Sequence, residues 1–224
     1  MKPRAPLRRV GLVGDAHCQA GALASAVSFL RAQGVDALLQ VGDILDGDGD
    51  ATRTCELLEE HDFIAVAGNH DRWALGDTIR DLPHATRLAE LSDDAARFLR
   101  SLPRTRELET AAGLALLCHG LGENDMACVK ADDGADRLAA NAELQALLAA
   151  GRHAWVLNGH THERLVRRVG SLTIVNAGTL LPGDSPCVAV VDFAAESAAF
   201  FDWAEGGRFR PAETVRLDSW AEVF

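Results

Sequence analysis

The stretch RVGLVGDAH, residues 9–17, contains the two features on which the predicted fold depends. Its first part, Arg9–Gly14, is short and mostly apolar, which is typical of a strand buried on both faces, as in a parallel sheet. Two polar side chains, Asp15 and His17, follow directly. In sheets of parallel strands, ligands bind beyond the carboxyl ends of the strands. The stretch therefore predicts a buried strand that ends in a ligand site.

The same pattern recurs at four further predicted strands, each of which leads into a polar loop. These are Ala37–Val41 before Gly42-Asp43, Phe63–Ala67 before Gly68-Asn69-His70-Asp71, Leu114–Leu117 and Cys118 before His119-Gly120, and Ala154–Leu157 and Asn158 before Gly159-His160-Thr161-His162. Because the carboxyl ends of parallel strands meet at one edge of a sheet, we expect the five loops to converge on one crevice.

Helices are predicted between and after these strands, at Ala20–Gln33, Thr52–Glu60, 86–101 and about 135–150. The alternation of strand and helix indicates βαβ units. From residue 164 onward, closer spacing predicts antiparallel strands at Arg164–Val169, Leu172–Asn176, Val188–Phe193 and Ala198–Trp203. No repeat or linker divides the chain, so we expect one α/β domain over residues 1–224.

The charge balance restricts the class of partner. The 224 residues include 22 Lys and Arg against 33 Asp and Glu, which gives a net charge of −11. Such a surface lacks the excess of positive charge that neutralises phosphate groups. We therefore do not expect a nucleic-acid polymer or an anionic membrane as a partner. An acidic protein does suit the concentration of divalent cations. The sequence leaves the oligomeric state open.

The first residues resemble the start of a signal peptide, because Met1–Arg4 is basic and Arg8 and Arg9 follow. However, the apolar run Val10–Val13 is too short for a signal-peptide core or a membrane span. We therefore expect a soluble, cytoplasmic protein. Its five cysteines are scattered without a C-x-x-C pair, so we expect reduced thiols at Cys18, Cys55, Cys118, Cys128 and Cys187.

Seven side chains in the polar loops have the chemistry of metal ligands. They are Asp15, His17, Asp43, Asn69, His119, His160 and His162. Carboxylate, imidazole and amide donors without a thiolate suit Mn, Fe, Zn, Ni or Mg, of which we favour Mn. One cation takes three or four such ligands, so seven, including one carboxylate able to bridge, suffice for two divalent cations. Two cations about 3.5–4 Å apart can share a hydroxide and hold a phosphoryl group.

Taken together, the motifs D-x-H, G-D-x-x-D, G-N-H-D, H-G and G-H-T-H resemble those of the calcineurin-like metallophosphoesterase superfamily. The resemblance runs from residue 9 to about 180, because Asn176-Ala177-Gly178-Thr179 also matches the turn that follows the last motif in small members. It implies an α/β fold in which a sandwich of two β-sheets is flanked by helices. Cys18 departs from the family pattern, which has a glycine after the first histidine.

The resemblance also implies roles for single residues. It assigns Asp15, His17 and His162 to a first metal, Asn69, His119 and His160 to a second, and Asp43 to a bridge between them. It assigns two catalytic residues beside the metals, with His70 protonating or stabilising the leaving oxygen and Asp71 orienting the His70 ring. It leaves Asp46 as a support for the loop that carries Asp43.

The implied activity is hydrolysis of a phosphoester by a metal-bridging hydroxide. The short spacers between motifs leave no room for a cap domain, so we expect a small substrate of the nucleotide or cyclic-nucleotide type, as monoester or diester. A protein phosphatase is an alternative, for which Arg72 is the only candidate site arginine. A non-catalytic scaffold for protein binding is a second alternative, which the full set of motif residues disfavours.

Three residues are candidates for binding the leaving group. Trp73 follows the G-N-H-D motif, and Asn124 and Asp125 lie in a glycine-containing loop directly after His119. An indole can stack on a base, and the amide and carboxylate can bind hydroxyl groups. The alternative is that Trp73 packs in the core and that Asn124 and Asp125 cap the following turn.

Overall fold

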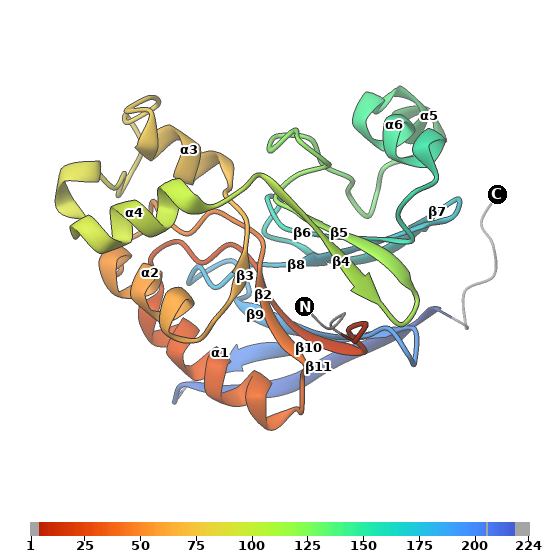
Figure 1. Cartoon of the computed structure of the whole chain (residues 1–224), viewed down its shortest axis with the longest axis horizontal. Coiled ribbons are helices and arrows are strands. Elements are labelled where there is room, and N and C mark those ends of the chain that lie inside the picture. The colour runs from red at the N-terminus through yellow and green to blue at the C-terminus, as the bar shows by residue number, and fades with distance from the viewer. Residues whose placement is uncertain (1–4, 205, 218–224) are drawn as a thin grey trace.

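Two β-sheets pack face to face in the computed structural model, which describes residues 5–204 and 206–217 (Figure 1). The basic segment Met1–Arg4 lies outside the described residues. Helices cover the outer face of each sheet (Figure 1). This confirms the sandwich that the motifs implied.

The first sheet has six strands in the described part of the chain. Their order is β11 (Arg208–Arg216), β10 (Ser197–Ala204), β9 (Cys187–Asp192), β1 (Arg9–Val13), β2 (Ala37–Gln40) and β3 (Ile64–Ala65). Strands β1, β2 and β3 are parallel, whereas β9 runs antiparallel to β1. The predicted βαβ units are therefore confirmed, and β9, β10 and β11 complete the same sheet.

The second sheet has five strands among the described residues. Their order is β4 (Thr105–Thr110), β5 (Gly113–Cys118), β6 (Trp155–Asn158), β8 (Leu172–Ala177) and β7 (Arg164–Val169). Strands β5, β6 and β8 are parallel, and β4 and β7 are antiparallel edge strands. The strands that precede the predicted ligands thus belong to both sheets.

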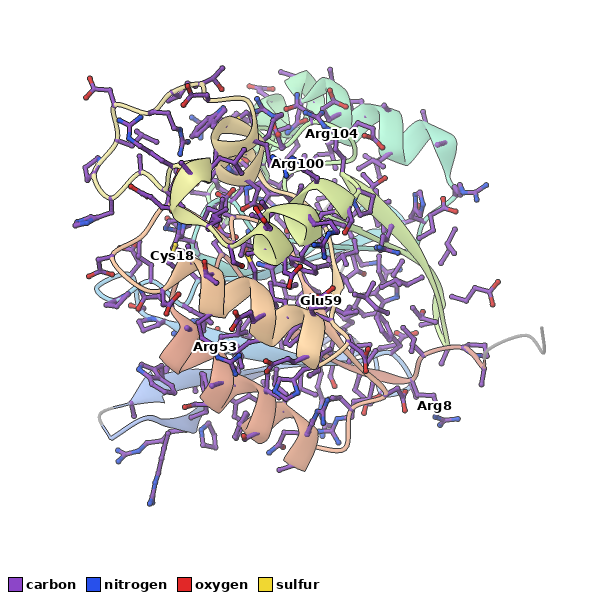
Figure 2. All side chains as sticks on the ribbon, turned by 60° about the vertical axis from the view of Figure 1, so that its left-hand side comes forward. Arg8, Cys18, Arg53, Glu59, Arg100 and Arg104 are labelled. Carbon is purple, nitrogen blue, oxygen red and sulfur yellow. The ribbon has the colours of Figure 1, made fainter. Side chains whose placement is uncertain are left out.

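Apolar side chains fill three layers. The central layer lies between the sheets and includes Leu12, Trp155 and Phe200. The second lies under α1 (Ala20–Ala32), α2 (Ala51–Glu60) and α4 (Asp93–Ser101), and the third under α5 (Ala135–Ala140) and α6 (Ala142–Ala150). Charged side chains such as Arg53 and Glu59 cover the outside of α2 (Figure 2).

Several helix boundaries differ from the prediction. The helix predicted at 86–101 begins at Asp93, because the Ser92 side chain accepts a hydrogen bond from the Ala95 N–H and caps it. The one helix predicted at about 135–150 is two, because Asn141 caps α6 in the same way. The short helix η1 (Leu88–Glu90) lies inside the predicted range and is separate from α4, whereas the prediction lacked the short helix α3 (Asn69–Leu75).

The prediction also lacked two strands, β4 and β11, both of which lie at a sheet edge. Edge strands carry many exposed polar residues, which weakens the apolar pattern that reveals a strand. No helix in the described ranges is long and apolar enough to cross a membrane. All five cysteines lie within the described residues and are free thiols, as expected.

Candidate metal centre

The loops that follow parallel strands of both sheets meet on one side of the molecule. All seven predicted ligands come together there in two groups. The first contains Asp15, His17 and His162, and the second contains Asp43, His119 and His160. Asn69 lies beside the second group, with its amide oxygen 2.9 Å from His119 Nε2 and 3.0 Å from His160 Nδ1. Within each group of three, the possible ligand atoms lie within 4.8 Å of one another.

The backbone that carries these side chains is strained. Four of the seven residues have a positive φ, namely His17 (42°), Asp43 (50°), His160 (73°) and His162 (60°). A left-handed conformation costs a residue with a side chain about 1–2 kcal/mol. Strain of this kind persists where the surrounding structure enforces it, and it clusters at functional sites. Cys18 shares this conformation, with a φ of 63°, at the position where the motif usually has glycine.

Two glycines allow the loops to approach one another. A Cβ atom at Gly68 would overlap the carboxylate of Asp43, and one at Gly159 would overlap the carboxylate of Asp15. Both glycines directly precede predicted ligands in the sequence. Any larger residue would therefore displace a carboxylate from its group.

Ring nitrogens with free lone pairs face one another in the first group. His17 Nδ1 lies 2.9 and 2.8 Å from the carbonyl oxygens of residues 45 and 46, so this nitrogen donates and Nε2 keeps its lone pair. His162 Nδ1 lies 2.9 Å from the Asp184 carboxylate. The two Nε2 atoms are 3.0 Å apart, and His162 Nε2 is 3.3 Å from Asp15 Oδ2. Such a convergence of electron pairs fits a cation.

The second group has the same chemistry. His119 Nδ1 lies 2.9 Å from the Val41 carbonyl oxygen, so it donates, and Nε2 faces Asn69 Oδ1 at 2.9 Å and Asp43 Oδ2 at 3.1 Å. The orienting bond to a backbone carbonyl is the arrangement that metal-binding histidines usually have. These donors are oxygen and nitrogen atoms, so the group fits the hard and borderline divalent cations expected from the sequence.

Burial of so many titratable groups shifts their pKa values. Burial raises the pKa of Asp15 to about 7. Burial lowers the pKa of His119, but the nearby Asp43 and Asp15 carboxylates outweigh it and raise the value to about 10. Burial likewise raises the pKa of Asp43, and His119 outweighs it and lowers the net value. A cation favours deprotonated ligands, so metal binding at this cluster should release protons.

His70 lies beside the two groups and belongs to neither. Its Nδ1 is 2.8 Å from Asp46 Oδ2, and its Nε2 is 3.9 Å from Asp43 Oδ2. Partial burial lowers the pKa of His70, but the hydrogen bond to Asp46 and the charge of Asp43 raise it by more. The imidazole is therefore suited to donate a proton next to the cluster.

Asp71 does not orient His70, and that expectation is wrong. Its buried carboxylate accepts hydrogen bonds from the backbone N–H groups of residues 44, 45 and 68, at 2.9, 3.1 and 2.9 Å. Asp71 therefore joins the loop after β2 to the start of α3, and Asp46 holds the His70 ring. The resemblance implied this role for Asp71, but His70 and Asp71 are neighbours in helix α3, and helix geometry directs adjacent side chains to different sides.

Trp73 lies at the edge of the site. Its ring centroid is 4.8 Å from that of His70, and the Arg72 guanidinium carbon lies 6.0 Å from the Trp73 ring centroid. The indole is only partly buried. Its ring therefore lies against the His70 imidazole at the edge of the site.

The loop after β5 divides into two parts. Asp125 is mostly buried and accepts two hydrogen bonds from the Arg72 guanidinium, at 2.6 and 2.9 Å, which joins the loop to α3. Asn124 is exposed, and its side-chain oxygen accepts a hydrogen bond from the Met126 N–H at 3.0 Å. Asn124 therefore caps a turn, as in the alternative interpretation, whereas Asp125 forms an ion pair beside the site.

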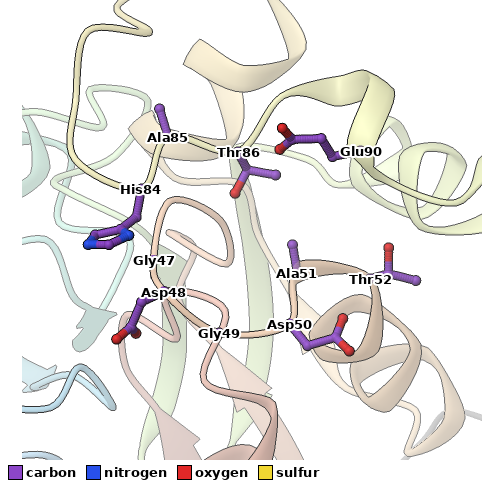
Figure 3. Close-up of a pocket in the computed structure, with 10 residues that line it drawn as sticks. All are labelled: Gly47, Asp48, Gly49, Asp50, Ala51, Thr52, His84, Ala85, Thr86 and Glu90. Carbon is purple, nitrogen blue, oxygen red and sulfur yellow. The ribbon is translucent and has the colours of Figure 1, made fainter.

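A separate pocket lies next to the loop that follows β2 (Figure 3). Its lining includes Asp48, Asp50 and Glu90 but none of the seven predicted ligands. Asp48 accepts a hydrogen bond from the Gln19 amide, and Asp50 and Glu90 accept bonds from backbone N–H groups at the start of α2 and η1. These acidic groups therefore hold loops and helix ends in place.

Sequence reasoning missed two residues that contact the site. Arg80 binds the Asp46 carboxylate, and Asp184 binds His162. Both lie in loops outside the recognised motifs, and neither has a characteristic spacing from its partner. The charged residues in the loops between the motifs include both, but no feature of the sequence distinguishes Arg80 and Asp184 from the other charged residues there.

Comparisons with known proteins agree with this geometry. A family model described as the calcineurin-like phosphoesterase superfamily domain matches residues 9–196. No curated protein gives a significant match.

Solved structures share the fold at low sequence identity. A metallophosphoesterase from Sphaerobacter thermophilus is 20% identical, with a TM-score of 0.65 over 87% of each chain. The E. coli phosphoesterase Yfce is 16% identical, with a TM-score of 0.56 over 93% of this chain and 99% of its own. Wild-type Vps29 from Entamoeba histolytica, solved with zinc, is 16% identical, with a TM-score of 0.53 over 92% of this chain and 98% of its own.

Proposed function

Because this chain belongs to the calcineurin-like phosphoesterase superfamily, we propose that it hydrolyses a small phosphoester with the help of two divalent cations. The observation that carries the proposal is the convergence of two donor groups beside a histidine that belongs to neither. A structural cluster of buried ions has no need of such a histidine next to it. In hydrolysis of an ester, cations can supply the hydroxide and a histidine beside them can protonate the leaving oxygen.

We assign one cation to Asp15, His17 and His162 and the other to Asn69, His119 and His160. Asp43 is assigned to both, because its charge acts on His17 in the first group as well as on His119 in the second. When bound, two divalent cations supply a hydroxide at neutral pH and positive charge for the phosphoryl oxygens. Manganese remains our preferred metal on the basis of the nitrogen and oxygen donors.

His70 supplies the proton for the leaving oxygen in this proposal. If Nδ1 donates to the Asp46 carboxylate, the second proton of the imidazolium sits on Nε2, which lies on the side of Asp43. The Asp46 and Asp43 carboxylates raise the pKa of His70, which favours the protonated imidazole. Asp46 acts through His70 and is a positioning residue.

We assign recognition of the leaving group to Trp73, which packs beside His70. A partly exposed indole offers a flat apolar surface on which an aromatic ring can stack. The proposed substrates are therefore small phosphoesters whose leaving group is aromatic or nucleoside-like. The fully assembled ligand groups favour catalysis over a scaffold role. Arg72 is already paired with Asp125, which weakens the case for a protein phosphatase that uses this arginine at its site.

The test is a panel of phosphomonoesters and phosphodiesters assayed after chelation and after reloading with Mn, Mg, Zn or Ni. We expect chelation to abolish hydrolysis of at least one class and one of the metals to restore it. A protein that binds metal but hydrolyses no ester in the panel would favour the scaffold alternative. Hydrolysis that survives complete chelation would contradict the metal-dependent reaction.

A further inference from the structure

A segment between α3 and η1, residues 76–87, passes next to the loop that carries Asp46. We call it the strap. Its Arg80 side chain is only 7% exposed and binds the Asp46 carboxylate with both terminal nitrogens, at 2.8 and 2.9 Å. The planar guanidinium matches a carboxylate in this two-bonded geometry, which fixes orientation as well as distance.

The strap holds Asp46 by its backbone as well. The Thr86 N–H donates to Asp46 Oδ1 at 2.8 Å, and the Asp46 N–H donates to the Thr86 hydroxyl at 3.1 Å. Arg80 is itself fixed, because it donates to the carbonyl oxygens of Thr78 and Thr86 at 2.9 and 3.0 Å. Figure 3 shows Thr86 on the strap, across from the loop of residues 47–50. These bonds leave the carboxylate little freedom to rotate.

The remaining contact of the Asp46 carboxylate is with His70 Nδ1, at 2.8 Å from Oδ2. The chain of bonds therefore runs from Arg80 through Asp46 to the imidazole. On the basis of the function proposed above, we propose that Arg80 is a positioning residue for His70. It fixes the Asp46 carboxylate so that His70 Nε2 is held toward the leaving oxygen.

The strap shows strain next to Arg80, which supports this role. Ile79 has a φ of 50° and is 53% exposed. A branched side chain seldom adopts this conformation, and an exposed isoleucine gains little from burial to offset it. The contacts of its neighbour Arg80 provide the compensation, because the buried guanidinium donates four hydrogen bonds, two of them to the Asp46 carboxylate. Backbone strain that is held by a contact to the Asp46–His70 pair is typical of functional loops.

The experiment compares Arg80→Met and Arg80→Lys with the wild type on p-nitrophenyl and phenyl esters of the same phosphate. Loss of a residue that orients a site residue by hydrogen bonds typically lowers activity by about 10–100-fold. We expect that loss in kcat for the phenyl ester, whose leaving group needs a proton, and at most about a 3-fold loss for the p-nitrophenyl ester. Arg80→Lys keeps the charge and should recover part of the loss. Metal content should not change.

Arg53→Met is the matched control, because Arg53 also binds carboxylates with its guanidinium but does so on the exposed face of α2 (Figure 2). It should leave both rates unchanged. Equal losses on the two esters, or an unchanged rate on the phenyl ester, would overturn the role of Arg80. If Arg80→Met does not fold, the same comparison with Arg80→Lys decides.

A second measurement separates this inference from the proposed function. Nitrogen NMR of the magnesium-loaded protein detects the His70 Nδ1 proton through its hydrogen bond to Asp46. We expect a slowly exchanging proton in the wild type and fast exchange in Arg80→Met. If the wild type cleaves no ester, the proposed function fails, but loss of this slow exchange in Arg80→Met would still support Arg80 as the residue that fixes His70. Unchanged slow exchange in Arg80→Met would overturn it.

Discussion

The imidazole of His70 is bound to the carboxylate of Asp46, with 2.8 Å between Nδ1 and Oδ2, although the two residues lie in different loops. Asp71, the sequence neighbour of His70, binds backbone N–H groups instead. The two acidic residues therefore have separate tasks. Asp46 serves the site, and Asp71 holds the loops that form it.

Asp71→Ala should destabilise the fold. Three buried N–H groups would lose their acceptor, and each costs about 1–3 kcal/mol when left unpaired, so we expect a loss of about 3 kcal/mol or more in the free energy of unfolding. Urea denaturation of the metal-loaded protein measures it. The control is Asp94→Ala on α4, whose side chain is 71% exposed and which should change stability by less than about 1 kcal/mol. An Asp71 variant of unchanged stability but reduced kcat would restore the catalytic role.

His70→Asn should slow the reaction without loss of metal. Removal of one general acid typically costs about 10²–10⁴-fold, so we expect this loss in kcat for the phenyl ester and a smaller one for the p-nitrophenyl ester. Kinetics and metal analysis of the same preparation measure both effects. Equal losses on the two esters would show that His70 is not the acid, and a loss of metal would show that it is a ligand.

Gly68→Ala should disrupt the site, because the added Cβ overlaps the Asp43 carboxylate and backbone. We expect metal content to fall and activity to be lost. Gly21→Ala is the control, since a Cβ at that position in α1 meets nothing within 4 Å. There the substitution should raise the free energy of unfolding slightly, by up to about 1 kcal/mol, because alanine is a better helix former than glycine. Full metal binding by Gly68→Ala would refute the close approach.

Trp73→Leu tests recognition of the leaving group. The indole lies beside His70, so its loss should raise KM for a nucleotide substrate while leaving the KM of a small alkyl ester unchanged. Steady-state kinetics on the two substrates provides the comparison. A parallel loss on both, together with a lower melting temperature, would indicate that Trp73 only packs against its neighbours.

Much of the site could be predicted from the sequence because each ligand follows a buried strand. The position of a side chain such as Asp15 or His119 is fixed by the strand before it. The predicted ends of the strands therefore indicate where the ligands lie. The same reasoning placed Asn69 and His70 together after β3. These contacts depend on local sequence and on a parallel sheet, both of which leave a clear pattern.

The parts that could not be predicted depend on loops that meet only in the folded chain. The bond between Arg80 and Asp46 spans 34 positions and has no periodic signal. The family resemblance implied Asp71 as the partner of His70, and no local pattern in the sequence indicates that Asp46, 24 positions away, takes this place. The edge strands β4 and β11 were missed because their polar faces dilute the apolar alternation.

The central claim is that the site holds two divalent cations that share Asp43 and are needed for hydrolysis. Metal analysis of the purified protein, combined with an ester assay on the same sample, tests it most directly. We predict two cations per chain in the active wild type, and fewer than two with no turnover in a folded Asp43→Ala variant. A fully active wild type with one cation or none, or Asp43→Ala that hydrolyses the ester at the wild-type rate, would contradict the claim.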